Sequence, residues 1–314
     1  MHKIKLLVIS VLSLLVMVTA VGCGDDAAWV FGSNHEYATR DDGLEGVEET
    51  YGFNFDEVDI MDTGITYGAL RDGEVHAAMG FATDGRVAGF DLVTLEDDMA
   101  FHPVYNAAPN LREDVYEDYP ELEEILFELS QILDNESIQE LNARVDIEEE
   151  EPEEVAEDFL GEEGLINGAG DNVGDGASVS VGSKEFTEQL ILGQLTILLL
   201  EEHGFDVEDN TGLGGTDVLR QALEDGDVDI KWEYTGTALI SHLGHDEAIT
   251  DSEECYQVVK EEDLAENGVV WLDYSEIDNT YTIMMREEDA EELGIQSISD
   301  LADAINEGVE PPSN

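Results

Sequence analysis

Basic residues are scarce in this chain. Only 12 Lys plus Arg stand against 77 Asp plus Glu among 314 residues, and the formal net charge is -65. A field of this sign repels polyanions, so the composition disfavours nucleic acid and anionic membrane surfaces as partners. The chain is still 42% hydrophobic, which separates it from a disordered acidic segment and allows a core. Its acidity is typical of a halophilic protein, and we expect the fold to need molar salt, where the Debye length falls to about 3 Å.

Cysteine and long apolar runs are also rare. The two cysteines, Cys23 and Cys255, offer no disulfide framework. The one long apolar run, 6–21, follows two lysines and is shorter than the roughly 20 residues that a membrane-spanning helix needs. We therefore interpret residues 1–22 as a secretory signal. Residues 20–23, Ala-Val-Gly-Cys, resemble a lipobox, which implies a lipid on Cys23 and an extracytoplasmic protein anchored to the membrane; an uncleaved short anchor is the alternative.

Sequence signatures of catalysis and of metal or phosphate binding are absent as well. No nucleophile elbow, Cys–His pair or cofactor fingerprint is present, so the sequence predicts neither an enzyme nor a cofactor. The glycine-rich segment 212–216 lacks the lysine of a phosphate-binding loop and is interpreted as a tight strand-to-helix turn. His242 and His245 with Asp246 lack a third strong ligand at supporting spacing. No metal site is predicted, and both histidines are interpreted as surface residues.

One unit occurs twice, as ALRDGEV at 69–75 and as ALEDGDV at 222–228. It predicts a helix end, a glycine in the left-handed region and a strand that runs inward. An aromatic residue follows eight positions after each glycine, Phe81 in the first copy and Tyr234 in the second. Each aromatic should therefore lie near the carboxyl end of a strand, where open α/β sheets bind ligands. Two such ends indicate two similar lobes that face one cleft.

A glycine-rich segment, 161–178, divides the chain, since six of its eighteen residues are glycine, as in a flexible linker. Before it, apolar residues at helical spacing predict helices after Pro120 and from Pro152. After it, strands are predicted over 179–182 and 228–232 and helices over 187–203 and 217–224. This alternation of strands and helices predicts parallel sheets.

The stretch 182–190, GSKEFTEQL, resembles the opening of the glycine betaine and choline binding proteins of ABC transporters. Segments similar to the rest of that family's front half follow in the family's order: 214–216 (GGT), 233–237 (EYTGT) and 278–281 (DNTY). Segments similar to its back half lie before the linker: 36–40 with 42–44 (DGL), 83–86 (TDGR), 95–98 (LEDD) and 105–109 (YNAAP). Together they cover nearly all of the mature chain, but the back half comes first.

The resemblance implies an α/β fold, namely the two-lobed type II periplasmic-binding-protein fold with a ligand cleft between its lobes, here circularly permuted. The back half is expected over 23–160 and the front half over 179–314, with the linker 161–178 joining the family's old termini. One lobe would combine 28–103 with 279–314 and the other 104–160 with 179–278, with hinge crossings near Pro103 and Asn279. A flexible linker of this length spans about 23 Å. A recombined remnant of a tandem pair, whose halves pair between molecules, is the rival explanation.

Binding residues are carried over from the family onto the matching motif positions. A quaternary ammonium cannot donate a hydrogen bond, so aromatic faces must recognise it, while cationic donors suit its carboxylate. The resemblance implies an aromatic cage of Tyr234, Tyr281, Tyr105 and Phe81, the last in place of the family's tyrosine. It also assigns the carboxylate to Arg40, Lys184 and Thr237. Glu36 either orients Arg40 or is an exposed acid at a helix start.

The predicted function is therefore that of a substrate-binding lipoprotein of an ABC importer, which captures glycine betaine, choline or a related quaternary-ammonium solute for osmoprotection. Its expected partners are that small molecule, an ABC permease with its ATPase, and the membrane through the N-terminal lipid. A ligand sensor or interaction module outside transport, or a decayed rearranged copy, is the alternative.

Overall fold

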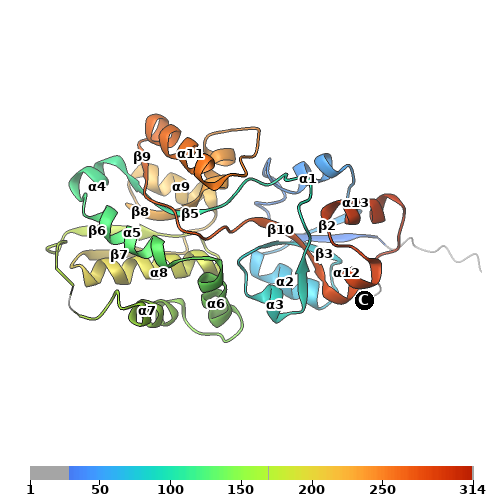
Figure 1. The fold of residues 1–314 in the computed structure, drawn as a ribbon, viewed down its shortest axis with the longest axis horizontal. Helices are drawn as coiled ribbons and strands as arrows, with labels where there is room; N and C mark the ends of the chain where they lie inside the picture. Colours follow the sequence, from blue (N-terminus) through green and yellow to red (C-terminus); the bar gives the residue numbers. More distant parts are fainter. Residues whose placement is uncertain (1–27, 169, 313–314) are drawn as a thin grey trace, which may run out of the picture.

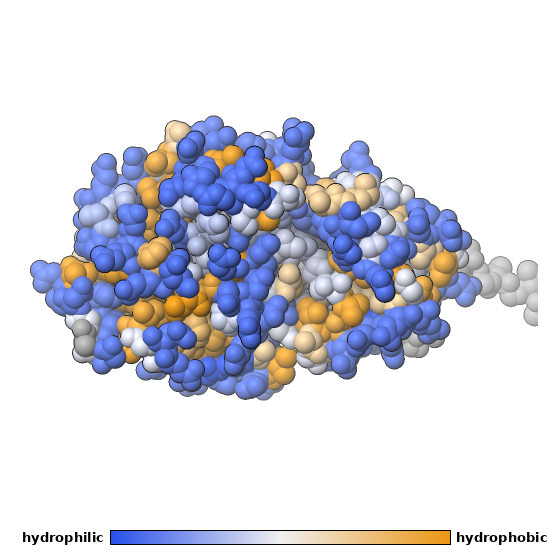
Figure 2. Space-filling view, viewed as in Figure 1, coloured by the Kyte–Doolittle hydropathy of each residue, from blue (hydrophilic) through white to orange (hydrophobic). Residues whose placement is uncertain are grey.

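The computed structural model describes residues 28–168 and 170–312, so the predicted signal peptide and Cys23 lie outside the described residues. The described chain forms two lobes, each built around one five-stranded sheet (Figure 1). Hydrophilic residues cover most of the face shown in Figure 2, as expected of so acidic a sequence. No helix in the described ranges is long and apolar enough to cross a bilayer.

The first lobe is discontinuous in sequence. Its strands are β1 (Val30–Ser33), β2 (Glu57–Ile60), β3 (Ala77–Phe81), β4 (Leu92–Thr94) and β10 (Tyr281–Arg286), in the order β2-β1-β3-β10-β4. β1 pairs in parallel with β2 and β3, whereas β10 is antiparallel to β3 and β4. The helices of this lobe are α1 (Leu44–Tyr51), α2 (Thr63–Arg71), α3 (Arg86–Gly89), α12 (Glu287–Leu293) and α13 (Ile298–Asn306).

The second lobe repeats this sheet. Its strands are β5 (Ala107–Arg112), β6 (Ser178–Gly182), β7 (Asp206–Asn210), β8 (Ile230–Tyr234) and β9 (Val269–Trp271), in the order β7-β6-β8-β5-β9. β6 is parallel to β7 and β8, and β5 is antiparallel to β8 and β9. Its helices are α4 (Glu113–Asp118), α5 (Leu122–Ile132), α6 (Asn135–Asp146), α7 (Pro152–Glu163), α8 (Thr187–Glu202), α9 (Thr216–Asp225), α10 (Thr235–Thr237), the π-helical turn η1 (Ala238–His242) and α11 (Ser252–Asn267).

Both sheets are mixed, which corrects the prediction of parallel sheets. The chain crosses between the lobes twice, in the segments 95–106 and 272–280, and these two segments are bridged to each other at Asn106 and Asp278. β5 and β10 directly follow the crossings, so each enters its sheet from the edge at which β8 or β3 ends. Each must therefore run opposite to its neighbour, as the pairing of Tyr281 with Phe81 shows.

The repeated unit forms the predicted structure in both lobes. After α2, Gly73 has a φ of 77°, and β3 then ends at Phe81. After α9, Gly226 has a φ of 80°, and β8 ends at Tyr234. Glycine suits both turns because a Cβ atom makes this left-handed backbone conformation unfavourable. The unit thus delivers one aromatic residue per lobe to the edge of the sheet that faces the other lobe.

The central helix α8 explains how the loop before it is fixed. Its sequence is apolar on almost every side, and residues such as Leu192, Leu195 and Leu199 are fully buried. A helix of this kind must be covered all round, and α8 packs between the sheet of its lobe and helices α5, α6 and α7. Because α8 begins at Thr187, the preceding residues Lys184 to Phe186 are held between a buried strand and a buried helix.

The connection between the two halves is shorter than the predicted linker. Helix α7 begins at Pro152, as predicted, but continues to Glu163 and so takes up the first residues of that segment. The remaining residues lead directly to β6, which lies in the same lobe as α7. Both ends of this connection therefore belong to one lobe.

A candidate ligand-binding cleft

A cavity of about 820 Å³ lies between the lobes and is lined by residues of both. All eight residues that the sequence assigned to ligand binding line it: Glu36, Arg40, Phe81, Tyr105, Lys184, Tyr234, Thr237 and Tyr281. They lie far apart in sequence and are brought together by the two sheet edges and the crossing segments. The sequence prediction missed other lining residues, among them Phe186, Thr216 and Asn279.

One wall of the cavity is aromatic. Phe81, the last residue of β3, is the register partner of Tyr281, the first residue of β10, and their ring centres are 5.2 Å apart. Tyr105, from the crossing segment before β5, meets Tyr281 edge to face with ring centres at 5.3 Å. These three rings are almost fully buried. Strand pairing and the crossing thus set the rings at fixed angles to one another.

Phe186 joins the aromatic residues of the two lobes. Its ring stacks on Phe81 at 5.2 Å and 18° and lies 6.4 Å from Tyr234 at 23°. Phe186 is part of the motif that carries the family resemblance, but only its neighbour Lys184 was assigned a role. A signal was available, because Phe186 follows closely after the carboxyl end of a strand, as Phe81 and Tyr234 mark the ends of theirs.

Arg40 is held between two carboxylates. It donates to both oxygens of Asp42, from Nε at 2.7 Å and from Nη2 at 2.6 Å, and its Nη1 donates to Glu36 at 3.0 Å. Its guanidinium carbon lies 5.4 Å from the ring centre of Tyr281, and the Tyr105 hydroxyl donates to Asp42. Burial raises the pKa of Asp42, but the hydrogen bonds and charge of Arg40 outweigh it and leave this pKa below its ordinary value. With one cation and two anions, this group is negative overall.

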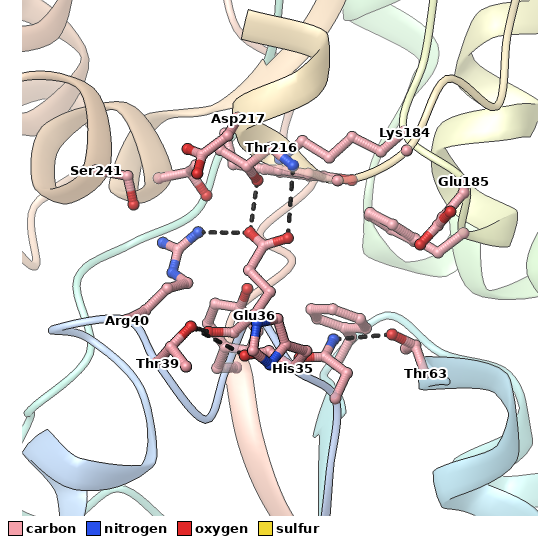
Figure 3. A pocket seen from close by; sticks show the side chains of 18 of the residues that line it. His35, Glu36, Thr39, Arg40, Thr63, Lys184, Glu185, Thr216, Asp217 and Ser241 are labelled. Carbon is pink, nitrogen blue, oxygen red and sulfur yellow. Dashed lines mark hydrogen bonds and ion pairs between the residues drawn. The ribbon is translucent and has the colours of Figure 1, made fainter. Parts of the chain in front are cut away.

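Glu36 reaches across the cleft, as Figure 3 shows. One carboxylate oxygen accepts from Arg40 and from the Thr216 hydroxyl, the latter at 2.6 Å, and the other accepts from the Thr216 backbone N–H at 3.4 Å. Burial raises the pKa of Glu36, but the charges of Lys184 and Arg40 lower it below its ordinary value. An ionised Glu36 in the first lobe therefore contacts the start of α9 in the second lobe.

Lys184 belongs to a second, positive group. Its ammonium donates to Glu233 at 2.7 Å, and Lys231 donates to the other oxygen of the same carboxylate at 2.6 Å. Glu233 is completely buried; burial raises its pKa, but the two lysines outweigh this and hold the pKa well below its ordinary value. Burial lowers the pKa of Lys231 below its ordinary value; when both lysines are protonated, two ammonium groups share one carboxylate and one positive charge is uncompensated within this group. Lys184 lines the cavity and presents this charge to it.

His242 is not the surface residue that the sequence predicted. Its side chain is only 4% exposed, and Nε2 lies 3.4 Å from Glu233. Burial lowers the pKa of His242 below its ordinary value, which favours a neutral ring. No group of three or more His, Cys, Asp or Glu side chains suited to a metal ion occurs in the described part of the chain.

The lobes also touch on the far side of the aromatic wall. The Thr83 hydroxyl of the first lobe donates to Glu188 of the second at 2.5 Å, and Arg86 lies 3.3 Å from Asp146 of α6. Together with the contact of Glu36, these interactions join the two lobes on both sides of the aromatic residues. The described conformation is that of a cleft with its lobes in contact.

Comparisons with known proteins agree with this architecture. A family model for the substrate binding domain of the ABC-type glycine betaine transport system matches residues 21–162 and 177–312. The chain is 47% identical over 130 residues to a glycine-betaine-binding protein of Pseudomonas aeruginosa, which is 41% of each chain. It is 37% identical over 131 residues to the glycine betaine-binding protein YehZ of Escherichia coli, covering 41% of this chain and 43% of that one.

A third relative comes from Halobacterium salinarum. This chemotactic signal transduction system substrate-binding protein, CosB, is 36% identical over 132 residues, covering 41% of this chain and 40% of that one. The chain thus spans less than half the length of each of these relatives in a single alignment. The family model, in contrast, matches nearly all of the chain in two segments, and its members bind substrates and are not enzymes, as the sequence predicted. The two-lobed α/β protein belongs to the family of substrate binding domains of ABC-type glycine betaine transport systems.

Proposed function

We propose that this protein captures glycine betaine, choline or a related quaternary-ammonium solute in the cleft and delivers it to an ABC permease with its ATPase. The observation that carries the proposal is the convergence of all eight predicted residues on one cavity, which is lined by aromatic rings and by two cations, Arg40 beside Tyr281 and Lys184 beside Tyr234. Such a solute has a cation that cannot donate hydrogen bonds and often a carboxylate that accepts them. The cavity offers both kinds of recognition.

The aromatic wall would hold the quaternary ammonium. Tyr234, Tyr281, Tyr105 and Phe81 line the cavity and would offer their π faces to the ligand, and we add Phe186 because it stacks between the rings of the two lobes. Each such face contributes about 0.5–2 kcal/mol to binding a desolvated cation. Rings from both lobes would meet the same cation, so the ligand would favour the closed form.

The carboxylate would meet Lys184, Arg40 and the Thr237 hydroxyl. Lys184 comes from a group with one uncompensated positive charge, which a carboxylate would neutralise. Arg40 is already bonded to Glu36 and Asp42, so these acids would orient its remaining donors toward the ligand. Among the described residues, Lys184 and Arg40 are the only Lys or Arg residues that line the cavity. A carboxylate bound in the cavity would therefore have these two side chains as its Lys or Arg partners.

We further propose that the chain is a circular permutation of the family. The relative from Pseudomonas aeruginosa aligns over 41% of its own length and 41% of this chain, as expected when a linear alignment can follow only one of two exchanged halves. Trp29 Nε1 donates to the Val309 carbonyl at 2.9 Å, so segments near both ends of the described chain lie side by side. The break between the matched segments, at 163–176, falls at the connection within the second lobe.

Location outside the cytoplasm, with a lipid on Cys23, completes the proposal and rests on the sequence of residues 1–23. A sensor role is the second candidate, favoured by the relative that serves chemotactic signal transduction in Halobacterium salinarum. Both roles need the same ligand-binding cleft. Permease and ATPase genes beside this one would favour transport, whereas a neighbouring transducer gene would favour sensing.

The test is calorimetric titration of the mature protein in molar salt with glycine betaine and with choline, with its mass in solution measured alongside. We expect one site per monomer. Tyr281→Leu should weaken both ligands at least tenfold, whereas Tyr274→Leu, which removes a ring outside the cavity, should leave both unchanged. A folded protein that binds neither ligand would refute the proposed function, and one site per monomer in an obligate dimer would favour halves that pair between chains.

A further inference from the structure

Glu188 is a buried carboxylate directly behind the aromatic wall. It lies in the first turn of α8, is 3% exposed, and accepts four hydrogen bonds. One oxygen accepts from the Tyr234 hydroxyl at 2.7 Å and from Asn279 Nδ2 at 2.9 Å. The other accepts from the Thr83 hydroxyl at 2.5 Å and from Asn142 Nδ2 at 3.3 Å. Four donors on two oxygens suit an ionised carboxylate.

No cation of the described chain pairs with Glu188, since its four hydrogen-bond partners are all neutral. This sets it apart from the other buried carboxylates. Each of those has an Arg or Lys partner: Asp42, Asp84, Glu233, Asp263 and Asp289. A buried charge without a counter-charge is unfavourable, so its retention at this place calls for a reason.

The neighbouring cations are paired with other carboxylates. The ammonium of Lys184 lies 5.2 Å from the ring centre of Tyr234 but is bonded to Glu233. Arg86 lines the same small cavity as Glu188, but it is paired with Asp84 and Asp146. That triad is itself negative by one, so the region behind the wall holds two uncompensated negative charges when all three acids are ionised. The same small cavity is lined by Phe81 and Phe186, which places the negative region against the rings proposed to hold a cation.

We propose that Glu188 is the counter-charge for the ligand's quaternary ammonium and selects cationic ligands over uncharged molecules of the same shape. This inference rests on the proposed function of the cleft. The hydroxyl bonded to Glu188 belongs to Tyr234, so the carboxylate adds electron density to a ring that would face the cation. A bound cation would in turn compensate the buried charge. Thr83 belongs to the first lobe, so the carboxylate is fully hydrogen-bonded only while the lobes are in contact.

The decisive comparison uses two ligands of one shape. Choline carries the positive charge, and 3,3-dimethylbutan-1-ol replaces its nitrogen with carbon and is neutral. In molar salt, Glu188→Gln should weaken choline at least tenfold, which corresponds to about 1.4 kcal/mol, and should change the neutral alcohol less than twofold. Glu201→Gln, which removes one charge at the exposed far end of the same helix, is the matched control and should change neither affinity.

The glutamine variant should fold. The buried Oδ1 atom of Asn279 has no hydrogen-bond partner in the described structure, so this amide can turn and accept from the new side-chain amide. Near-ultraviolet circular dichroism checks the packing, and Glu188→Asp, which keeps the charge, should retain more choline affinity than glutamine does. Equal losses of both ligands in Glu188→Gln would show a merely structural role and overturn the inference, as would no loss at all.

The pH dependence of choline binding gives an independent readout. Burial raises the pKa of Glu188 above its ordinary value, and its hydrogen bonds offset this only in part. Choline affinity in the wild-type protein should therefore rise as the pH rises through that raised pKa, as the carboxylate ionises. Asp146 also has a pKa raised by burial, and Asp84 and Arg86 face the same region, but these groups remain in Glu188→Gln.

Any part of the pH dependence of choline affinity that Glu188→Gln loses therefore arises from Glu188. A pH dependence that is the same in the variant as in the wild-type protein would overturn the inference. If the wild-type protein binds choline and Glu188→Gln binds it with the same affinity, this inference is overturned but the proposed function stands. A folded wild-type protein that binds no quaternary ammonium would overturn the proposed function and this inference with it.

Discussion

Replacing Lys184 with methionine should weaken a betaine and spare choline. In the variant, Glu233 keeps the ammonium of Lys231 at 2.6 Å, so no buried carboxylate loses its last partner and the fold should survive. What the cleft loses is the positive charge that Lys184 presents to it. A hydrogen bond between charged groups contributes about 1.5–3 kcal/mol, so the Kd for glycine betaine should rise about 10- to 100-fold. Choline has no carboxylate, and its Kd should change by less than about twofold.

Calorimetry with both ligands in molar salt measures this difference directly. The matched control is Lys260→Met, because Lys260 lies on α11, outside the cavity, and its ammonium donates to the Tyr256 hydroxyl at 2.9 Å. Lys260→Met changes the net charge of the protein by the same amount as Lys184→Met. It therefore also measures how much a lost positive charge far from the cavity affects binding. If Lys184→Met weakens glycine betaine and choline by the same factor, the carboxylate does not meet Lys184 and the assignment is refuted.

Further outcomes follow from the same contacts. Arg40→Ala should weaken glycine betaine more than choline and should also destabilise the protein by about 3–5 kcal/mol, because buried Asp42 loses its ion-pair partner; a denaturant titration measures the second effect. Phe186→Leu should weaken choline at least tenfold in calorimetry while Phe127→Leu, at an exposed ring, should not. Phe81→Tyr adds the hydroxyl that the family resemblance implies at this position and should bind glycine betaine more tightly, and equal affinity would show that this hydroxyl is unimportant. Circular dichroism should show unfolding as salt falls well below molar concentration, and full structure in dilute buffer would contradict that expectation.

The sequence predicted those parts of the fold that depend on neighbouring residues. The repeated helix, glycine and strand formed as expected because Gly73 and Gly226 meet a local backbone demand. The directions of β5 and β10 could not be read in the same way. A strand's direction in a sheet depends on where the chain enters it, and that entry follows from the crossing of the cleft, which no local pattern records.

The site shows the same division. Tyr234 and Phe81 were placed near strand ends by local pattern, but most site residues came from family resemblance, and the structure brings all of them to one cavity. Glu188 and the buried His242 were not found. An acid in the first turn of a helix reads as an ordinary favourable charge, and a histidine in a short helical turn carries no periodicity that reveals burial. Their surroundings come from distant segments, such as Thr83 for Glu188.

The proposed permutation would leave the cleft unchanged for a reason visible in the sheets. Each sheet has the same order, with a pair of parallel strands, a third parallel strand that ends at the cleft, an antiparallel strand from the other half, and a final edge strand. A chain that starts at β6 and continues from the segment near Val309 into the segment at Trp29 would build the same two sheets with the lobes exchanged. Only two connections would differ, and both lie away from the aromatic wall. Because ligand recognition depends on where strand ends meet and not on which lobe comes first, natural selection for binding would not distinguish the two orders.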